Sequence, residues 1–475
     1  MASMTDKTDL TRGPVGGTLI RLTIPMVGGM FGMVAFNLAD TYFVAQLDKG
    51  LPAASNLAAM GFIHPVVMFF FMIAMGIGIG TSSVVSRAYG RGDLDQVQRL
   101  TTDSIRLAFC VVLLFSFLGL ALMEVPFRWQ GAHEDLLPKI REYMVVWYAG
   151  LAVVVLPMVA NNAMRGAGDT LWPAAIMLVA AAINVILDPI FIFGWWGVPA
   201  LGITGAALAT VISRGLTLIA SLAVLHYRKQ MIAVGRLHLG ELLDSWKQVL
   251  YVGIPASATN ILFPLAFGVI NYLARQTGTS EQASKAAVAA IAAGSRIESF
   301  AMMVLWSLAG TILAFVGQNW GAKKFDRVHL AERDAMVFSI GWGLLCWATL
   351  AALSGPIAHA FTSKPLVARD LQLFLWIAPA GYGLRGVCFL ASRSFSAINR
   401  PMDASTLDIL RMFLLYVPLA WIGSELGGLT GIFIGVAVGN VIAGVISWAR
   451  FRQVRRRLEH RIRTTDAEPA TVVAE

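Results

Sequence analysis

Three acidic side chains lie inside long apolar stretches of the sequence, where charged residues are rare. Asp40 lies in the run NLADTYFVAQL, Asp188 in NVILDPIFIF and Glu298 in GSRIESF. A carboxylate in the hydrocarbon core of a membrane costs about 2.5–3.5 kcal/mol on insertion scales, so each one needs a partner or a task. Acids in such positions mark ion and substrate pathways. Proton or cation binding is therefore the first chemistry to consider.

Two of these acids are predicted to lie at one depth. Asp40 and Asp188 each precede the outer end of a predicted helix by seven residues, and Thr210 follows the start of the next helix by eight. At 1.5 Å per residue, all three lie roughly 10–12 Å below the outer surface. Asn184 stands four residues before Asp188 and shares its helix face. We expect these four side chains to converge.

The convergence would form a cage of oxygen atoms. Buried acids that lie close together can hold a proton near neutral pH. The same oxygens suit a small hard cation such as Na⁺, and Pro189 frees a further carbonyl at Val185. A purely structural role, as hydrogen-bonding links between helices, is the alternative. Glu298 is expected to form a structural ion pair with Arg385, and a role in coupling is the alternative.

The elements that hold these residues are predicted to be membrane-spanning helices. The chain has 475 residues, of which 57% are hydrophobic and 14% charged, and its mean hydropathy is +0.68. Soluble domains carry about 25% charged residues. Apolar runs long enough to cross about 30 Å of hydrocarbon predict an all-α integral membrane protein. The twelve runs are 18–47, 57–86, 104–124, 143–164, 172–196, 202–226, 248–274, 286–316, 335–354, 370–392, 405–423 and 429–449.

The distribution of charge predicts how the chain is oriented. Most Lys and Arg residues fall in the segments on the same side as the N-terminus, which places both termini in the cytoplasm. The net charge of +9 has this explanation, so no nucleic-acid partner is expected. The basic tail RFRQVRRRLEHRIR, at 450–463, is predicted to be a solvated or headgroup-contacting extension of the last helix. We expect a multi-pass protein of the cytoplasmic (inner) membrane.

Three pairs of segments repeat at a spacing near 230. LTIPMVGG matches YVGIPASA, VVSRAYGRGDLD matches FVGQNWGAKKFD, and AMRGAGDTLWP matches SRSFSAINRP. Each half holds six spans, so the halves are predicted to be parallel, pseudo-symmetric repeats, an architecture found in transporters. The predicted parts are the N-terminal segment 1–15, an N-lobe at 16–226, a linker at 227–247, a C-lobe at 248–449 and a tail at 450–475.

A membrane-embedded enzyme is a rival of another class. It would need a nucleophile with a base, or clustered metal ligands. Seven His residues are scattered, and the three Cys residues are isolated within apolar runs. We therefore expect no enzymatic activity and no cofactor besides a coupling ion.

These segments resemble the MATE multidrug and toxin extrusion transporters over about 15–450. The residues that carry the resemblance are IPMVGGMFGMVAFNLADTYFVAQL, MRGAGDTLWP, NVILDPIFIFGWWGVPALGITGAALAT and VGQNWGA. The resemblance implies alternating access between two six-helix lobes, in a protein that we expect to be a monomer. It implies efflux of amphipathic, often cationic drugs, driven by H⁺ or Na⁺, with H⁺ preferred here.

The resemblance also assigns roles to residues. It implies cation coupling at four positions, matches Tyr143 and Asn161 to a neighbouring tyrosine and asparagine, and matches Pro25 to a bend in helix 1. The coupling positions are Asp40, Asn184, Asp188 and Thr210, which are also the positions of a possible Na⁺ site.

The second half departs from one branch of the family. The NorM-like branch carries acids in helices 7 and 10, whereas helix 7 here has none and helix 10 has Arg385. The chain therefore resembles the DinF-like branch, with coupling in the N-lobe. A flippase for lipid-linked saccharides or other lipid-like substrates is the nearest alternative function. Arg296 and Arg385 favour it, since it would need a basic, anion-matching cavity.

Overall fold

The protein was analysed as a computed structural model, which describes residues 9–47, 55–233, 235 and 238–467. Its described residues form helices joined by short turns, with no strand among them. Ten helices are long and apolar enough to cross a membrane, and the bent pair α5 and α6 adds an eleventh if it counts as one span. The prediction of an all-α membrane protein is confirmed.

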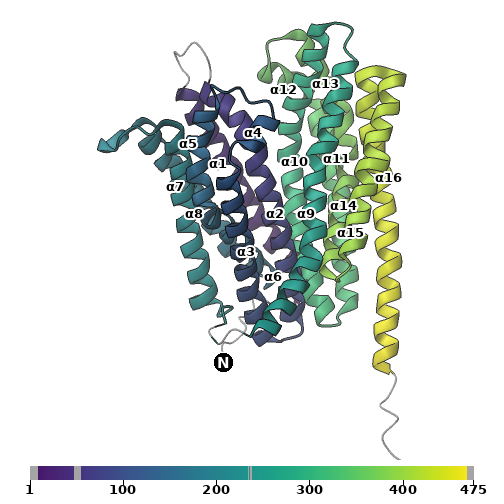
Figure 1. Ribbon diagram of the computed structural model, residues 1–475. Helices are drawn as coiled ribbons and strands as arrows, with labels where there is room; N and C mark the ends of the chain where they lie inside the picture. Colours follow the sequence, from purple (N-terminus) through teal and green to yellow (C-terminus); the bar gives the residue numbers. More distant parts are fainter. Residues whose placement is uncertain (1–8, 48–54, 234, 236–237, 468–475) are drawn as a thin grey trace, which may run out of the picture. The chain divides into compact units, whose positions relative to one another are not determined.

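The chain divides into two compact units. Unit 1 comprises Met1–Ile261 and Leu313–Ala322, and unit 2 comprises Leu262–Ile312 and Lys323–Glu475. The long helices α9 (Leu239–Gln276) and α10 (Glu281–Gly321) therefore each contribute to both units (Figure 1). The other helices of unit 1 are α1 (Val15–Leu47), α2 (Ser55–Gly90), α3 (Leu94–Ala121), α4 (Val125–Trp129), α5 (Leu137–Ala149), α6 (Leu151–Gly166), α7 (Leu171–Phe193), η1 (Trp195–Gly197), α8 (Gly202–Ala223) and η2 (Val224–Arg228).

In unit 2, the label α16 covers two helices that run in opposite directions. The stretch Pro401–Thr464 counts as a single candidate span, but Gly427 and Gly428 have non-helical backbone angles, and a Cβ atom on Gly423 would lie 2.0 Å from the backbone oxygen of Gly431. The chain therefore folds back on itself and supplies two spans. The helices of this unit are α11 (Phe325–Ala352), α12 (Ser354–Phe361), α13 (Pro365–Ile377), η3 (Ala378–Gly381), α14 (Tyr382–Ala397), α15 (Pro401–Ile409), η4 (Leu410–Tyr416) and α16 (Val417–Ala467).

One predicted span is bent. The run 143–164 was predicted as one span, and it is covered by two helices, α5 and α6, that meet at an angle of 49° at Gly150. A Cβ atom on Gly150 would lie 2.4 Å from Cγ2 of Val211, so glycine allows α8 to approach closely at the bend. By contrast, α1 continues as one helix through Pro25.

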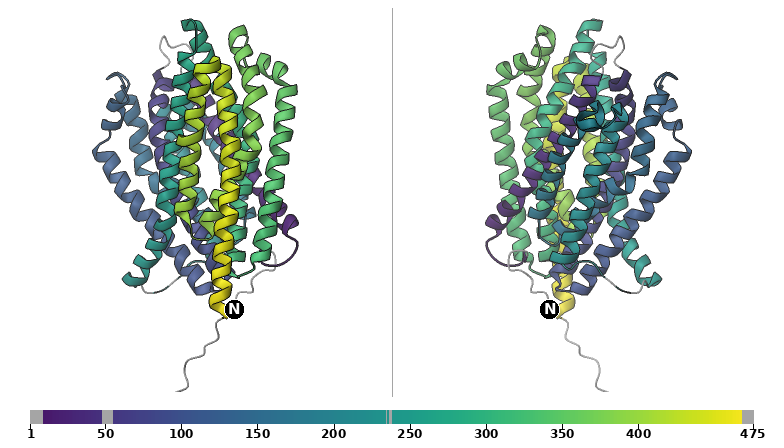
Figure 2. Two further views of the ribbon diagram at one scale, coloured as in Figure 1. Left: turned by 90° about the vertical axis from the view of Figure 1, so that its right-hand side faces the viewer. Right: turned by 90° about the vertical axis from the view of Figure 1, so that its left-hand side faces the viewer.

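The basic tail is more ordered than the sequence suggests. It continues α16 as one helix, drawn in yellow in Figure 2, and buries one face that includes Phe451. Arg455 is 2% exposed and donates a 2.7 Å hydrogen bond from Nη1 to Oε2 of Glu332 on α11. Glu459 lies 3.3 Å from Nε of the same arginine. The expectation of a merely solvated or headgroup-contacting extension is therefore wrong for this face.

The end of α10 packs closely within unit 1. A Cβ atom on Gly90 of α2 would lie 2.0 Å from the backbone oxygen of Gln318. The Gln318 side chain accepts a 3.1 Å hydrogen bond from the backbone N–H of Leu10 and donates a 3.0 Å bond to the carbonyl of Gly166. Asn319 donates to the carbonyl of Leu10 at 3.1 Å. The N-terminal segment is thus fastened to α10 by buried side chains.

Candidate functional site

Three helices of unit 1 present the oxygen atoms that were predicted to converge. Asp40 comes from α1, Asn184 and Asp188 from α7, and Thr210 from α8, and α7 packs against both other helices. Asn184 and Asp188 are fully buried, and Thr210 is 7% exposed. We refer to these four residues as the oxygen cluster.

The oxygen cluster is incompletely hydrogen-bonded. Nδ2 of Asn184 donates a 3.2 Å bond to Oδ1 of Asp188, as their four-residue spacing predicts. One buried oxygen of each residue has no hydrogen-bond partner among the described residues. These atoms are Oδ1 of Asp40, Oδ1 of Asn184, Oδ2 of Asp188 and Oγ1 of Thr210. Buried polar atoms are normally paired, so four unpaired oxygens indicate a place for a proton or a bound cation.

Electrostatic contacts link the cluster to a tyrosine. The carboxyl groups of Asp40 and Asp188 lie within electrostatic range of each other, and the phenol of Tyr143 lies within range of both. Tyr143 belongs to α5 and is 4% exposed. A phenol can donate a hydrogen bond to a carboxylate or accept one from a protonated acid, so Tyr143 can serve both protonation states.

Two other predicted site residues lie elsewhere. Asn161 of α6 accepts a 3.1 Å hydrogen bond from Oγ of Ser221. Ser221 follows Thr210 by eleven residues on α8, about 16 Å along the helix. Pro25 precedes Asp40 by fifteen residues, about 22 Å along α1. The structure therefore does not bring Asn161 to the oxygen cluster, and Pro25, which was matched only to a helix bend, lies far from the cluster along α1.

The donor set of the cluster limits which ions it can hold. No group of three or more His, Cys, Asp or Glu side chains suited to a metal ion occurs within the described ranges. Two carboxylates, an amide oxygen and a hydroxyl instead fit a proton or a monovalent hard cation. The donor atoms of the cluster are therefore compatible with one small cation.

Glu298, the acidic residue predicted inside a span of the second half, has hydrogen-bond partners. The Arg385 side chain donates from Nη1 to Oε1 of Glu298, and the hydroxyl of Tyr382 donates to Oε2 of Glu298 at 3.2 Å. The expected ion pair is thus present. Sequence reasoning did not single out Arg411, which lies in the predicted span 405–423 and is 3% exposed within unit 2. Its position ten residues after the helix-starting Pro401 was the available signal.

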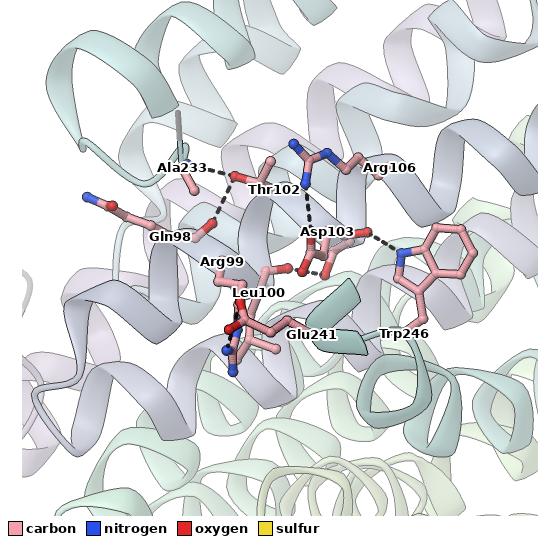
Figure 3. A network of polar contacts seen from close by, with 10 residues as sticks. Gln98, Arg99, Leu100, Thr102, Asp103, Arg106, Ala233, Glu241 and Trp246 are labelled. Carbon is pink, nitrogen blue, oxygen red and sulfur yellow. Dashed lines mark hydrogen bonds and ion pairs between the residues drawn. The ribbon is translucent and has the colours of Figure 1, made fainter. Parts of the chain in front are cut away.

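Sequence reasoning also missed a polar network at the start of α3 (Figure 3). Trp246 of α9 donates to the carbonyl of Asp103 at 3.0 Å, and Arg106 donates to the Asp103 carboxylate at 3.0 Å. Thr102 accepts a 2.8 Å bond from the backbone of Ala233. A cavity of about 450 Å³ adjoins this network. These contacts fasten the segment between the halves onto α3, and none of the oxygen cluster residues lines the cavity.

Comparison with known proteins identifies the family. The sequence model of the MatE family matches residues 25–190 and again 255–422, one match in each half. The chain belongs to the MATE transporter family. MATE proteins are ion-coupled transporters and not enzymes, so the expectation of no enzymatic activity is confirmed.

Several named transport proteins are similar to this chain over most of their length. The FAD transporter of Shewanella oneidensis is 33% identical over 442 residues, covering 93% of this chain and 95% of that protein. The multidrug export protein MepA of Staphylococcus aureus is 22% identical over 452 residues, covering 94% and 96%. The crystal structure of the Vibrio cholerae MATE transporter VcmN in the bent form matches with a TM-score of 0.86 at 31% identity, covering 93% and 97%.

Proposed function

We propose that this MATE protein is a proton-coupled antiporter that exports amphipathic, often cationic compounds by alternating access. The observation that carries the proposal is the oxygen cluster, where four residues of three helices each keep one buried oxygen without a partner. Such a set is costly unless it binds something during the transport cycle. The multidrug exporters among the relatives support the substrate class.

Each residue of the cluster has a distinct proposed role. Asp40 is the principal proton-binding carboxylate, because its Oδ1 is buried without a partner. Asp188 lies within electrostatic range and favours protonation of Asp40 by like-charge repulsion. Asn184 orients Asp188 through their hydrogen bond. Thr210 completes the cage from α8.

A proton is preferred over Na⁺ as the coupling ion for a physical reason. A proton is held by one carboxyl oxygen, whereas a metal cation must recover its lost hydration shell from several oxygens at once. The cluster supplies two carboxylates that repel each other when both are charged, and protonation of one relieves this repulsion. Loading from the outside and release to the inside would then drive export.

Ethidium efflux from proteoliposomes under an imposed pH gradient tests this proposal. Wild-type protein should export ethidium, and Asp40→Asn should reduce the rate to that of empty liposomes. Asp135→Asn is the matched control, because Asp135 is exposed outside the candidate spans and should keep the wild-type rate. Wild-type efflux by Asp40→Asn would refute the assignment of Asp40.

Export of a flavin nucleotide is a second candidate function. The relative from Shewanella oneidensis that covers 93% of this chain is named an FAD transporter. Unit 2 also buries Arg385 and Arg411, which are 4% and 3% exposed, and arginine is suited to bind phosphate groups. Direct comparison of FAD and ethidium export in the same proteoliposomes separates the two candidates. FAD export without ethidium export would favour the second.

A further inference from the structure

Arg411 is a buried charge that is hydrogen-bonded to no carboxylate of the described chain. Its side chain forms no hydrogen bond or salt bridge with any residue of the described chain, and its Nε is buried and unpaired. The guanidinium stacks over the Phe389 ring with 5.5 Å between Cζ and the ring centroid. A cation–π contact is far weaker than a buried ion pair, and buried charges are normally paired or bound to a ligand. The position therefore calls for an anion.

The backbone around Arg411 supports a functional role. Arg411 lies in η4, a π-helical stretch over Leu410–Tyr416. Wide turns of this kind occur frequently at functional sites. Arg411 lies six residues into the predicted span 405–423, roughly 9 Å along the helix from its start. We therefore expect the guanidinium inside the apolar core, where an unpaired charge is costly.

The surroundings of Arg411 carry a net positive charge. Cζ of Arg385 lies 5.8 Å from the centroid of the same Phe389 ring, so one ring contacts both guanidinium groups. Arg385 is paired with Glu298. Asp408 accepts a 2.8 Å hydrogen bond from Ser392 and lies within electrostatic range of Arg393 and Arg411. Three arginines therefore face two carboxylates in this part of unit 2.

We propose that Arg411 and Arg385 bind the phosphate group of a flat aromatic substrate, whose ring packs against Phe389. The proposal rests on the export function above and names the substrate class for its second candidate. Guanidinium groups bind phosphate through paired, charge-assisted hydrogen bonds, and a phosphate would supply the missing negative charge. The aromatic rings present an apolar surface on which a flat ring can stack.

One side of this site is accessible. The Glu298 side chain is 20% exposed, and Phe263, whose ring centroid lies 5.8 Å from Cζ of Arg385, is 39% exposed. Glu298 occupies Arg385 in the structure and would compete with an incoming phosphate for its hydrogen bonds.

Binding of riboflavin and of riboflavin 5′-phosphate (FMN) to the purified full-length protein tests the proposal. The two probes share one ring system and differ in the phosphate, and flavin fluorescence reports both. Wild-type protein should bind FMN at least about tenfold more tightly than riboflavin, because charge-assisted hydrogen bonds have this magnitude. Pyrophosphate should displace FMN but not riboflavin. Equal affinity of wild-type protein for both flavins would overturn the proposal.

Substitutions at Arg411 test whether this residue causes the preference for FMN over riboflavin. Arg411→Gln should abolish the preference for FMN and leave riboflavin affinity unchanged, whereas Arg411→Lys should retain part of it. Arg369→Gln is the matched control, since Arg369 is exposed on α13 and should keep the wild-type preference. If Arg411→Gln does not fold, the Lys variant and pyrophosphate competition still decide. A full FMN preference in a folded Arg411→Gln protein would refute the site.

Ethidium efflux separates this proposal from the proposed proton coupling. Asp40→Asn should lose ethidium efflux and keep the wild-type preference for FMN, because the substitution leaves Arg385 and Arg411 unchanged. This result would support both proposals independently. Loss of the FMN preference in folded Asp40→Asn would contradict a separate anion site.

Discussion

Asn184 and Asp188 lie one turn apart on α7, and their side chains share a 3.2 Å hydrogen bond from Nδ2 to Oδ1. This bond satisfies one oxygen of Asp188 and leaves its other oxygen unpaired, together with Oδ1 of Asp40 on α1. The pairing holds Asp188 in one orientation while the second oxygen remains available. The cluster is therefore partly fixed and partly open, which is what the proposed binding and release of an ion requires.

Removal of the Asn184 amide should impair coupling without unfolding the protein. Asn184→Ala loses the bond that orients Asp188, and a hydrogen bond to a charged group contributes about 1.5–3 kcal/mol, so proton-driven efflux should fall about tenfold. Ethidium efflux from proteoliposomes measures this effect. Asn271→Ala is the control, since Asn271 bonds only to the backbone of its own helix among the described residues. Equal efflux by the two variants would contradict a role for Asn184.

A methyl group at Gly90 should force α2 and α10 apart. Its Cβ would lie 2.0 Å from the backbone oxygen of Gln318, and overpacking of this kind costs about 1–3 kcal/mol. Gly90→Ala should lower the thermal unfolding midpoint in detergent and reduce transport. On the same helix, a Cβ on Gly61 meets nothing within 4 Å, so Gly61→Ala should be neutral or slightly stabilising. A Gly90→Ala protein as stable as Gly61→Ala would show that this contact is absent.

Gln318 should stabilise the N-terminal segment. Gln318→Ala leaves the backbone N–H of Leu10 and the carbonyl of Gly166 without these side-chain bonds, at a cost of about 1–3 kcal/mol for each group that stays buried. The thermal unfolding midpoint should fall, and proteolysis near Leu10 should become faster. Gln248→Ala removes a surface bond to Asp244 and should change neither property. If proteolysis near Leu10 is equally fast in Gln318→Ala and wild-type protein, the Gln318 side chain does not hold the N-terminal segment.

Arg455 should be essential for the position of the C-terminal extension of α16. Arg455→Ala leaves the buried carboxylates of Glu332 and Glu459 without their cation, and breaking a buried pair costs about 3–5 kcal/mol. The thermal unfolding midpoint should drop markedly. Arg457 is exposed, so Arg457→Ala should change stability by less than about 0.5 kcal/mol. Similar stability of the two variants would indicate a solvated extension after all.

Much of the fold follows from local features of the sequence. Asp40, Asp188 and Thr210 could be assigned to one depth from the helical rise and their distances from predicted helix ends. This works because membrane-spanning helices cross a layer of known thickness. The dipeptide Gly427–Gly428 likewise separates two predicted spans at the observed reversal. The bend at Gly150 was not predicted, since a glycine inside an apolar run does not reveal how closely α8 will approach.

Burial of charged residues was the harder part to predict. Asp408 and Arg411 lie in the predicted span 405–423, but composition does not show that their neighbours inside unit 2 are serine and arginine side chains. The tail at 450–463 reads as a solvated basic helix, because its partner Glu332 is more than a hundred residues away in sequence. Both cases depend on tertiary contacts, which periodicity and composition do not contain. Asn161 was placed by family resemblance alone, and its hydrogen bond to Ser221 holds it away from the cluster.

Ethidium efflux measured separately under a proton gradient and under a sodium gradient tests the central claim most directly. Proteoliposomes containing wild-type protein should export ethidium under the proton gradient and stay at the rate of empty liposomes under the sodium gradient. Asp40→Asn should abolish the proton-driven signal, and Asp135→Asn should preserve it. Efflux driven by sodium alone, or proton-driven efflux that survives Asp40→Asn, would contradict proton coupling at the oxygen cluster.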